Sequence, residues 1–141
     1  MDRDKQIDTF CRYSQVSRET IESLKNFEKN LLLANKRQNL IGKSTEKSIW
    51  TRHFLDSFQV FDFIDKNDKT IVDLGSGAGF PGLVLAIMAN DRKIPLKVRL
   101  IEKSSKKIRF LEEIAKELNL NVQISNENIL DSRKNFEENL F

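Results

Sequence analysis

The chain has few of the residues that build disulfide frameworks, metal clusters and membrane spans. Its 141 residues include one cysteine, Cys11, and one histidine, His53. A single cysteine excludes an internal disulfide, and without a Cys/His cluster of metal-ligand spacing we expect no bound metal. No apolar run approaches the roughly 20 residues of a membrane-spanning helix, and the polar start does not resemble a signal peptide. The sequence therefore predicts a cytoplasmic protein that is not embedded in a membrane.

The chain also lacks a strong excess of charge of either sign. Its 24 basic residues exceed its 21 acidic residues by only three, which permits a nucleic-acid partner without requiring one. Hydrophobic residues make up 39% of the chain, which is enough for a folded core. A length of 141 residues predicts one domain, or one domain with an appendage.

The first part of the chain, residues 1–66, has the pattern of a helical extension. Ser17 is placed to cap a helix that continues to Asn35, and Ser44 or Thr45 is placed to cap a second helix. Apolar residues recur at helical spacing in the second helix, at Ile49, Trp50, Phe54, Phe58 and Phe61. We expect Trp50, Phe54 and Phe58 in the core; the alternative is an aromatic ring that stacks on an extruded base.

The second part, residues 67–141, alternates between strand and helix patterns. Strands are predicted at 70–74, 97–102 and 122–124, and helices at about 81–90 and from Ser104 or Ser105 to Leu118. This order predicts an α/β fold with a parallel sheet and right-handed crossovers. Three strands are about half of a doubly wound sheet. We therefore expect either a fragment or shortened gene product, or an incomplete sheet that a partner chain covers; a free sheet edge favours such association.

A glycine loop follows the first predicted strand, with Gly75, Gly77 and Gly79 at alternate positions. Such a loop at the start of a helix presents backbone N–H groups to a polar or anionic part of a ligand, and Pro81 suits the first helical position. The loop also satisfies the dinucleotide pattern G-x-G-x-x-G, with Glu102 at a suitable distance beyond it. An NAD-binding half-domain is one interpretation, and a tight turn without a ligand is another.

Two carboxylates favour S-adenosylmethionine over NAD. Asp73 lies two residues before the first glycine, and Glu102 ends the next strand. S-adenosylmethionine carries an ammonium group, a carboxylate and a ribose diol. We expect Asp73 to act near the positive group, directly, through water or through the loop backbone, and Glu102 to accept hydrogen bonds from the diol.

Five segments of the sequence carry a family resemblance. They are Asn39-Leu40-Ile41, residues 52–57 (RHFLDS), residues 73–83 (DLGSGAGFPGL), residues 100–104 (LIEKS) and residues 107–111 (KIRFL). Together they resemble the RsmG (GidB) family, bacterial methyltransferases that act on guanine N7 of 16S ribosomal RNA. The resemblance covers about residues 20–131.

The resemblance implies a Rossmann-like class I methyltransferase fold with an N-terminal helical extension, in which residues 67–141 bind S-adenosyl-L-methionine. Gly75 and Phe80 match loop positions that hold this cofactor, and Glu102 matches the acidic residue that binds its ribose. The adenine-contacting pair of the family falls near Ile129 and Leu130. The implied partner is 16S ribosomal RNA or the small ribosomal subunit.

Methylation at guanine N7 requires no general base, because N7 attacks the sulfonium methyl group with an in-plane lone pair and has no proton to lose. Catalysis then depends on positioning and electrostatics, and we assign no catalytic side chain. We expect Arg52, His53, Asp56 and Ser57 to organise the site, with their helix packed over the glycine loop. The alternative for His53 is a helix-surface position paired with Asp56.

Two groups of basic residues are candidates for RNA contacts. The group beside the predicted cofactor edge consists of Lys103, Lys106, Lys107 and Arg109. The second group consists of Lys36, Arg37, Lys43 and Arg52. Phosphate contacts by such side chains would supply salt-dependent affinity, whereas the alternative is a solvated helix face. A non-catalytic remnant, which folds but modifies nothing, is the remaining interpretation.

Overall fold

The computed structural model of the protein describes residues 1–127, which include a parallel β-sheet. Among these residues the sheet has three strands in the order β1-β2-β3: β1 (Thr70–Leu74), β2 (Lys97–Glu102) and β3 (Val122–Asn126). Leu74 is in register with Ile101 on β2, and Glu102 with Asn126 on β3. The α/β class, the three strands and their parallel pairing were predicted and are confirmed. The third strand extends two residues beyond its predicted end, to Asn126.

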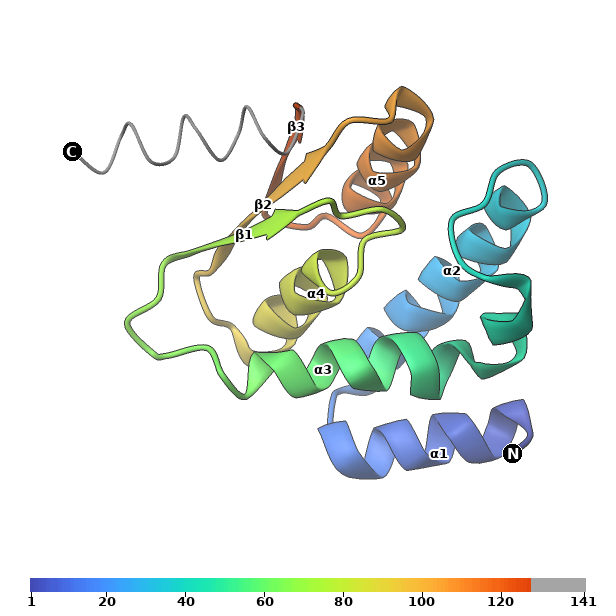
Figure 1. The fold of residues 1–141 in the computed structure, drawn as a ribbon. Helices are drawn as coiled ribbons and strands as arrows, with labels where there is room; N and C mark the ends of the chain where they lie inside the picture. Colours follow the sequence, from blue (N-terminus) through green and yellow to red (C-terminus); the bar gives the residue numbers. More distant parts are fainter. Residues whose placement is uncertain (128–141) are drawn as a thin grey trace.

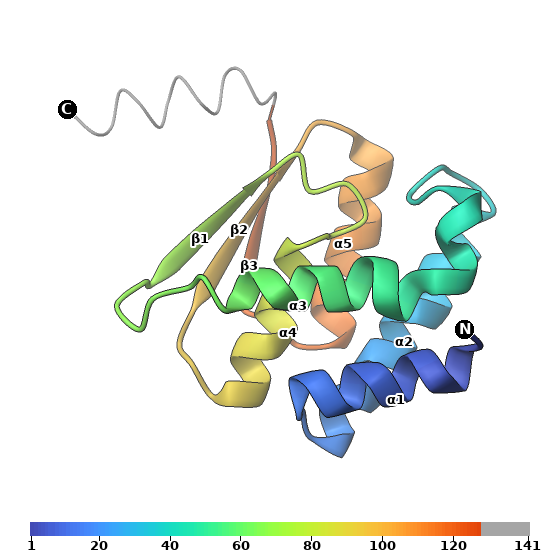
Figure 2. The same cartoon turned by 60° about the horizontal axis from the view of Figure 1, so that its bottom comes forward.

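Two helices connect the strands and cover one face of the sheet: α4 (Gly82–Arg92) and α5 (Ser105–Glu117) (Figures 1 and 2). Helix α4 is buried along residues 82–89, because it lies between the sheet and the N-terminal helices. Helix α5 instead buries one apolar stripe that includes Ile108, Leu111 and Ile114. Its N-cap is Ser104, whose Oγ accepts a hydrogen bond from Lys107 N at 3.4 Å.

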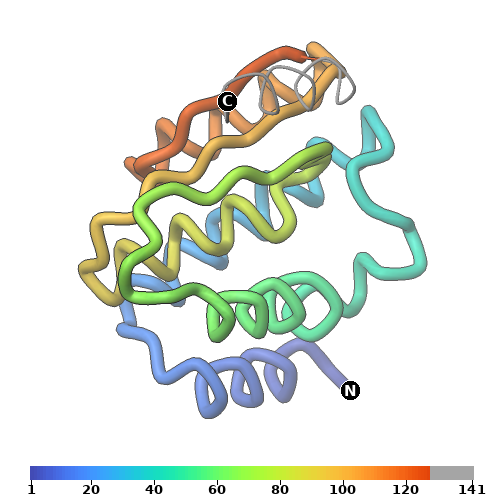
Figure 3. Tube along the Cα trace, turned by 60° about the vertical axis from the view of Figure 1, so that its left-hand side comes forward, coloured from blue at the N-terminus to red at the C-terminus, as the bar shows by residue number. Residues whose placement is uncertain are grey.

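The N-terminal helices form a further layer on the same side as α4. Helix α2 (Arg18–Asn35) packs against α4 and α5, and α1 (Arg3–Ser14) lies farther from the sheet (Figure 3). The predicted N-cap of α2 is confirmed, since Ser17 Oγ accepts from Thr20 N at 3.2 Å. A carboxylate of α4 supports the same turn: Asp91 Oδ1 accepts from Ser17 N at 2.9 Å and from Thr20 Oγ1 at 2.6 Å.

The segment 43–61 is not the single α-helix that its apolar spacing predicted. It consists of three successive helices of different types: the 3-10 helix η1 (Lys43–Ser48), the π-helix η2 (Ile49–Leu55) and the α-helix α3 (Asp56–Phe61). Gly42 stands at the N-cap position, so the prediction of Ser44 or Thr45 was wrong. The hydroxyl of Thr45 donates instead to Gly42 O at 2.7 Å, so it does not cap this helix.

One apolar core runs through both parts of the chain. It joins Phe10 and Phe27 of the N-terminal helices to Trp50, and these to Leu100 of β2 and Ile114 of α5. The predicted burial of Trp50, Phe54 and Phe58 is confirmed. The division of the chain into two parts at residue 66 stays a prediction.

Within residues 1–127, no helix combines the length and the apolar character needed to cross a membrane. In the same range the thiol of Cys11 is free, and no group of His, Cys, Asp and Glu side chains is arranged to hold a metal ion.

Candidate functional site

The glycine loop leaves β1 at the carboxyl end of the sheet and turns directly into α4. Gly75 N and Ser76 N both donate to Ile101 O, at 2.8 and 3.2 Å, so the start of the loop is fixed to the neighbouring strand. Gly79 N then donates to Ser76 O at 2.8 Å, and Leu83 N to Gly79 O at 2.7 Å. The loop therefore lies at the position where open α/β sheets hold their ligands.

The glycines of this loop serve two different purposes. Gly75, Gly77 and Gly79 all have positive φ, at 75°, 56° and 99°. A Cβ on Gly79 would lie 2.5 Å from Leu83 Cδ1, so the packing of α4 requires a glycine there. A Cβ on Gly77 would meet nothing nearer than Gly75 O at 4.0 Å. A ligand can therefore approach the main chain closely at Gly77.

Asp73 holds the start of α4. Its Oδ2 accepts a hydrogen bond from Gly82 N at 3.1 Å, which satisfies one of the free N–H groups of the helix. Helix α4 consequently begins at Gly82, and Pro81 is its N-cap rather than its first residue, which corrects the prediction by one position. Burial raises the pKa of Asp73, and the nearby charge of Glu102 adds to this rise. A role of Asp73 toward a ligand stays a prediction.

The Glu102 carboxylate joins the end of β2 to the glycine loop. Its Oε1 accepts from Gly77 N at 2.9 Å, and its Oε2 accepts from Lys103 N at 2.9 Å and from Ser104 N at 2.8 Å. Burial opposes its ionisation, but the three N–H donors and the charge of Lys107 outweigh burial and lower the pKa of Glu102. The structure thus places an ionised carboxylate beside the open glycine of the loop.

His53 meets the glycine loop through a ring stack. Its imidazole lies on Phe80 with a centroid distance of 4.8 Å and an interplanar angle of 18°. His53 Nε2 lies 2.9 Å from Thr45 Oγ1, and the Thr45 hydroxyl also lies 2.7 Å from Gly42 O. The Nε2–Oγ1 hydrogen bond fixes the ring against η1, and its direction follows the tautomer of the imidazole. Burial lowers the pKa of His53, and the charge of Asp56 only partly opposes this.

The remaining predicted site residues are distributed around this stack. Ser57 is buried, whereas Arg52 and Asp56 are exposed. Phe80 also stacks on Phe27, with centroids 5.5 Å apart and an interplanar angle of 9°, so its ring belongs to the aromatic core. Thr45, the partner of His53, was predicted only as a helix cap, and its role depends on a contact that no local pattern reveals.

The last two predicted cofactor residues, Ile129 and Leu130, lie outside the described residues.

The predicted basic residues lie at the start of α5. Lys103, Lys106 and Arg109 are exposed, and Lys107 is half-buried. Arg37, from the second predicted group, follows the end of α2 and lines a groove together with Lys106 and Arg109. The tertiary structure thus brings members of the two groups together.

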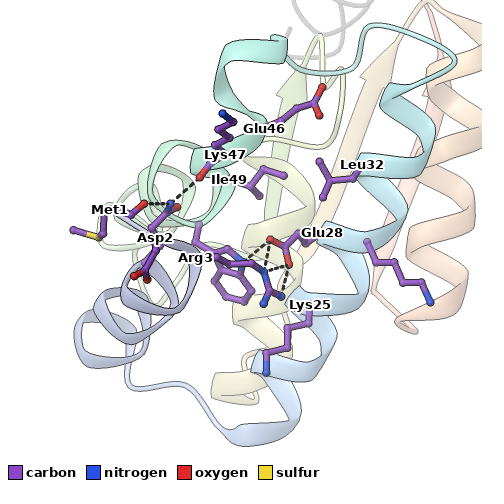
Figure 4. A pocket seen from close by; sticks show the side chains of 12 residues that line it. Met1, Asp2, Arg3, Lys25, Glu28, Leu32, Glu46, Lys47 and Ile49 are labelled. Carbon is purple, nitrogen blue, oxygen red and sulfur yellow. Dashed lines mark hydrogen bonds and ion pairs between the residues drawn. The ribbon is translucent and has the colours of Figure 1, made fainter.

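A larger hollow lies between α1, α2 and η1, and none of its lining residues belongs to the glycine loop (Figure 4). It has a volume of about 690 Å³, and Glu28 lies in its wall. Glu28 Oε1 accepts from Arg3 Nη2 at 2.7 Å, and its Oε2 accepts from Trp50 Nε1 at 2.9 Å. These contacts satisfy the buried carboxylate and join α1 and η2 to α2, which indicates a structural role that the sequence analysis missed.

Comparison with known proteins places these features in a family. The sequence pattern of GidB, described as "rRNA small subunit methyltransferase G", matches residues 20–139. The curated protein "Ribosomal RNA small subunit methyltransferase G" of Pelagibacter ubique (strain HTCC1062) is 40% identical over 121 residues, which are 84% of this chain and 57% of that protein. The protein of the same name from Rickettsia akari (strain Hartford) is 45% identical over 115 residues, which are 82% of this chain and 58% of that protein.

This chain therefore spans little more than half the length of these two relatives. Among solved structures, the crystal structure of coclaurine N-methyltransferase (CNMT) bound to N-methylheliamine and SAH matches with a TM-score of 0.45 and 16% sequence identity. That match covers 89% of this chain and 44% of the other.

Proposed function

The chain belongs to the family of rRNA small subunit methyltransferase G, and on this basis we propose that it carries the S-adenosyl-L-methionine site of an enzyme that methylates guanine N7 in 16S ribosomal RNA. The observation that supports this function best is the meeting of Gly77 and Glu102. Gly77 N lies 2.9 Å from Glu102 Oε1, at the carboxyl ends of two neighbouring parallel strands.

The residues at this point fit the cofactor. A ribose diol donates hydrogen bonds, and the ionised Glu102 offers acceptor oxygens at the edge of the loop. The nucleoside must also lie close to main chain, and Gly77 leaves the necessary space. Asp73 places a second carboxylate behind the loop, and its negative charge favours the ammonium group of the cofactor.

The cofactor supplies an activated methyl group when it is bound, so the protein has little acid–base chemistry to perform. Guanine N7 loses no proton on methylation, and positioning is the main task of the chain.

We propose that the His53–Phe80 stack forms the wall of the substrate side, organised by Arg52, Asp56 and Ser57. Gly75, Phe80, Ile129 and Leu130 complete the proposed cofactor contacts.

The proposed partner is 16S ribosomal RNA, either free or in the small ribosomal subunit, which places the protein in the cytoplasm. Lys103, Lys106, Lys107 and Arg109 supply positive charge beside the cofactor edge. Such side chains bind phosphates without regard to sequence, so we assign them affinity rather than recognition of a particular base.

Calorimetric titration with S-adenosylhomocysteine tests the cofactor site independently of RNA. We expect one molecule to bind per chain, and we expect NAD to give no binding heat. Glu102→Gln removes a charged acceptor and should weaken S-adenosylhomocysteine binding by about tenfold or more, since a hydrogen bond to a charged group contributes about 1.5–3 kcal/mol. The control is Glu112→Gln, which neutralises an exposed carboxylate of α5 and should leave the affinity unchanged. A wild-type chain that binds no S-adenosylhomocysteine would refute the proposed function.

A further inference from the structure

Two basic segments that are distant in the sequence border one groove. Arg37 and Gln38 follow the end of α2, and Lys106 and Arg109 lie in the first turns of α5. Gln38 Nε2 donates to the backbone oxygen of Lys106 at 3.5 Å, across a separation of 68 positions. The groove between them has a volume of about 220 Å³, and the buried Phe110 is part of its lining.

Helix geometry decides which basic residues of α5 reach this groove. Lys106, Arg109 and Glu113 are three or four positions apart, so they lie on one side of the helix, and all three line the groove. Lys107 is not among the lining residues, and its charge acts on the Glu102 carboxylate. Of the four basic residues in 103–109, which look equivalent in the sequence, Lys106 and Arg109 therefore line the groove, whereas Lys103 and Lys107 do not.

The groove also lies close to the proposed cofactor site. The backbone N–H of Ser104, the N-cap of α5, is held by Glu102. At 1.5 Å of helix rise per residue, Lys106 and Arg109 are about 3 and 8 Å along the helix from this point. Both side chains therefore lie within two helical turns of the residue that Glu102 holds.

We propose that this groove, through Arg37, Lys106 and Arg109, binds the phosphate backbone of the ribosomal RNA substrate; this rests on the proposed function. Three exposed cations oppose a single carboxylate, Glu113, so the local charge favours a polyanion. Two of the three cations are arginines, whose planar guanidinium groups match two phosphate oxygens at once. The buried residues Ala34 and Phe110 form part of the groove lining, between the segments that carry these cations.

The test is fluorescence anisotropy with transcribed 16S ribosomal RNA at a series of KCl concentrations. The triple variant Arg37→Gln, Lys106→Gln and Arg109→Gln should reduce the slope of log affinity against log salt by about 2–3, since each lost phosphate contact removes about 0.7–0.9. At about 0.1 M KCl it should also weaken binding by tenfold or more. The matched control neutralises three exposed lysines elsewhere, Lys66→Gln, Lys69→Gln and Lys116→Gln, and should change the slope by less than about 1.

A second variant should change RNA affinity in the opposite direction. Glu113→Gln removes the carboxylate that lines the groove, so we expect RNA to bind about two- to fivefold more tightly, the range of an exposed charge interaction. Glu112→Gln, one position away on α5 and outside the groove lining, is the control and should have a smaller effect. Both variants remove one negative charge from the same helix. A difference between them therefore shows an effect of the groove and not of the net charge of the protein.

An unchanged salt slope in the triple variant, or an equal gain in both glutamine variants, would overturn the proposal. Loss of binding to assembled small subunits with unchanged binding to the bare RNA would also overturn it, because the groove would then contact a protein. S-adenosylhomocysteine titration of the same preparations shows which inference has failed. Intact cofactor binding with unchanged RNA binding contradicts only the groove, whereas absent cofactor binding contradicts the proposed function.

Discussion

His53 shows how much a single side chain depends on its neighbours. Its sequence position suggested a pair with Asp56, yet its hydrogen bond goes to Thr45 and its ring lies on Phe80. Thr45 precedes it by eight positions in η1, and Phe80 belongs to the glycine loop. His53 therefore connects the N-terminal helical part to the proposed cofactor site, which suits a positioning residue.

The environment of His53 predicts its titration. Burial disfavours the imidazolium, so we expect a pKa below the ordinary value of 6.5 and a neutral ring at pH 7. Because the folded pKa is the lower one, the unfolded chain takes up the proton first as the pH falls. His53 therefore costs no stability above about pH 6.5, and stability declines as the pH falls from there toward the folded pKa.

This titration can be measured by NMR without ambiguity, because the chain has one histidine. The ¹⁵N shifts of the imidazole also show which ring nitrogen carries the proton at pH 7. Thr45→Val removes the hydrogen-bond partner of Nε2 and should change the tautomer populations while the ring stack persists. A pKa above 6.5 in the wild type would contradict the burial argument.

In the glycine loop, mutations can distinguish a contribution to stability from a contribution to ligand binding. Gly79→Ala places a methyl group 2.5 Å from Leu83 Cδ1, at a φ of 99°. Overpacking and left-handed strain together should lower the free energy of unfolding by about 2–4 kcal/mol. Gly77→Ala meets no close atom, so we expect only the strain of about 1–2 kcal/mol.

Ligand binding should be affected more strongly by Gly77→Ala than by Gly79→Ala, the reverse of the order expected for stability. Gly77→Ala fills the space where we propose the nucleoside approaches, so it should fold yet lose most of its affinity for S-adenosylhomocysteine. Urea denaturation and calorimetric titration of both variants give the two quantities. If Gly77→Ala kept full affinity, the open space at Gly77 would not be the site of approach.

Segment 43–61 shows why a local sequence pattern does not always predict the type of helix. Ile49, Trp50 and Phe54 are all buried, and the π-helix η2 carries all three. Spacings of three and four residues fit an α-helix, but they do not determine how tightly the backbone winds. The contacts of Trp50 with Glu28 and of His53 with Thr45 come from other elements, and such tertiary contacts override helix propensity.

At the scale of the whole molecule, β1 is an edge strand among the described residues. Val72 and Leu74 are 38% and 46% exposed, and they lie two positions apart, so they share one face of the strand. An edge strand with unpaired backbone groups and an exposed apolar face favours pairing with another chain. We therefore retain the prediction that the chain associates with a second copy.

Sedimentation at several protein concentrations tests this association. We expect a concentration-dependent dimer for the wild type, and a dissociation constant raised by about tenfold or more in Val72→Lys, because a lysine on the edge opposes pairing. Val60→Lys is the control, since Val60 is an exposed valine of α3, away from the sheet. A wild-type chain that is monomeric at every concentration would contradict the prediction.

The sequence alone determined those features that depend on neighbours within a few residues. Short apolar segments predicted the three strands, Ser17 and the pair Ser104 or Ser105 predicted two helix starts, and the glycines predicted the loop. Each of these follows from a backbone preference that acts locally. Tertiary structure alone decided the bond between Glu102 and Gly77, the stack of His53 on Phe80 and the groove shared by Arg37 and Lys106. These contacts join residues far apart in the chain, and their geometry is set by the packing of the shared core rather than by any local pattern.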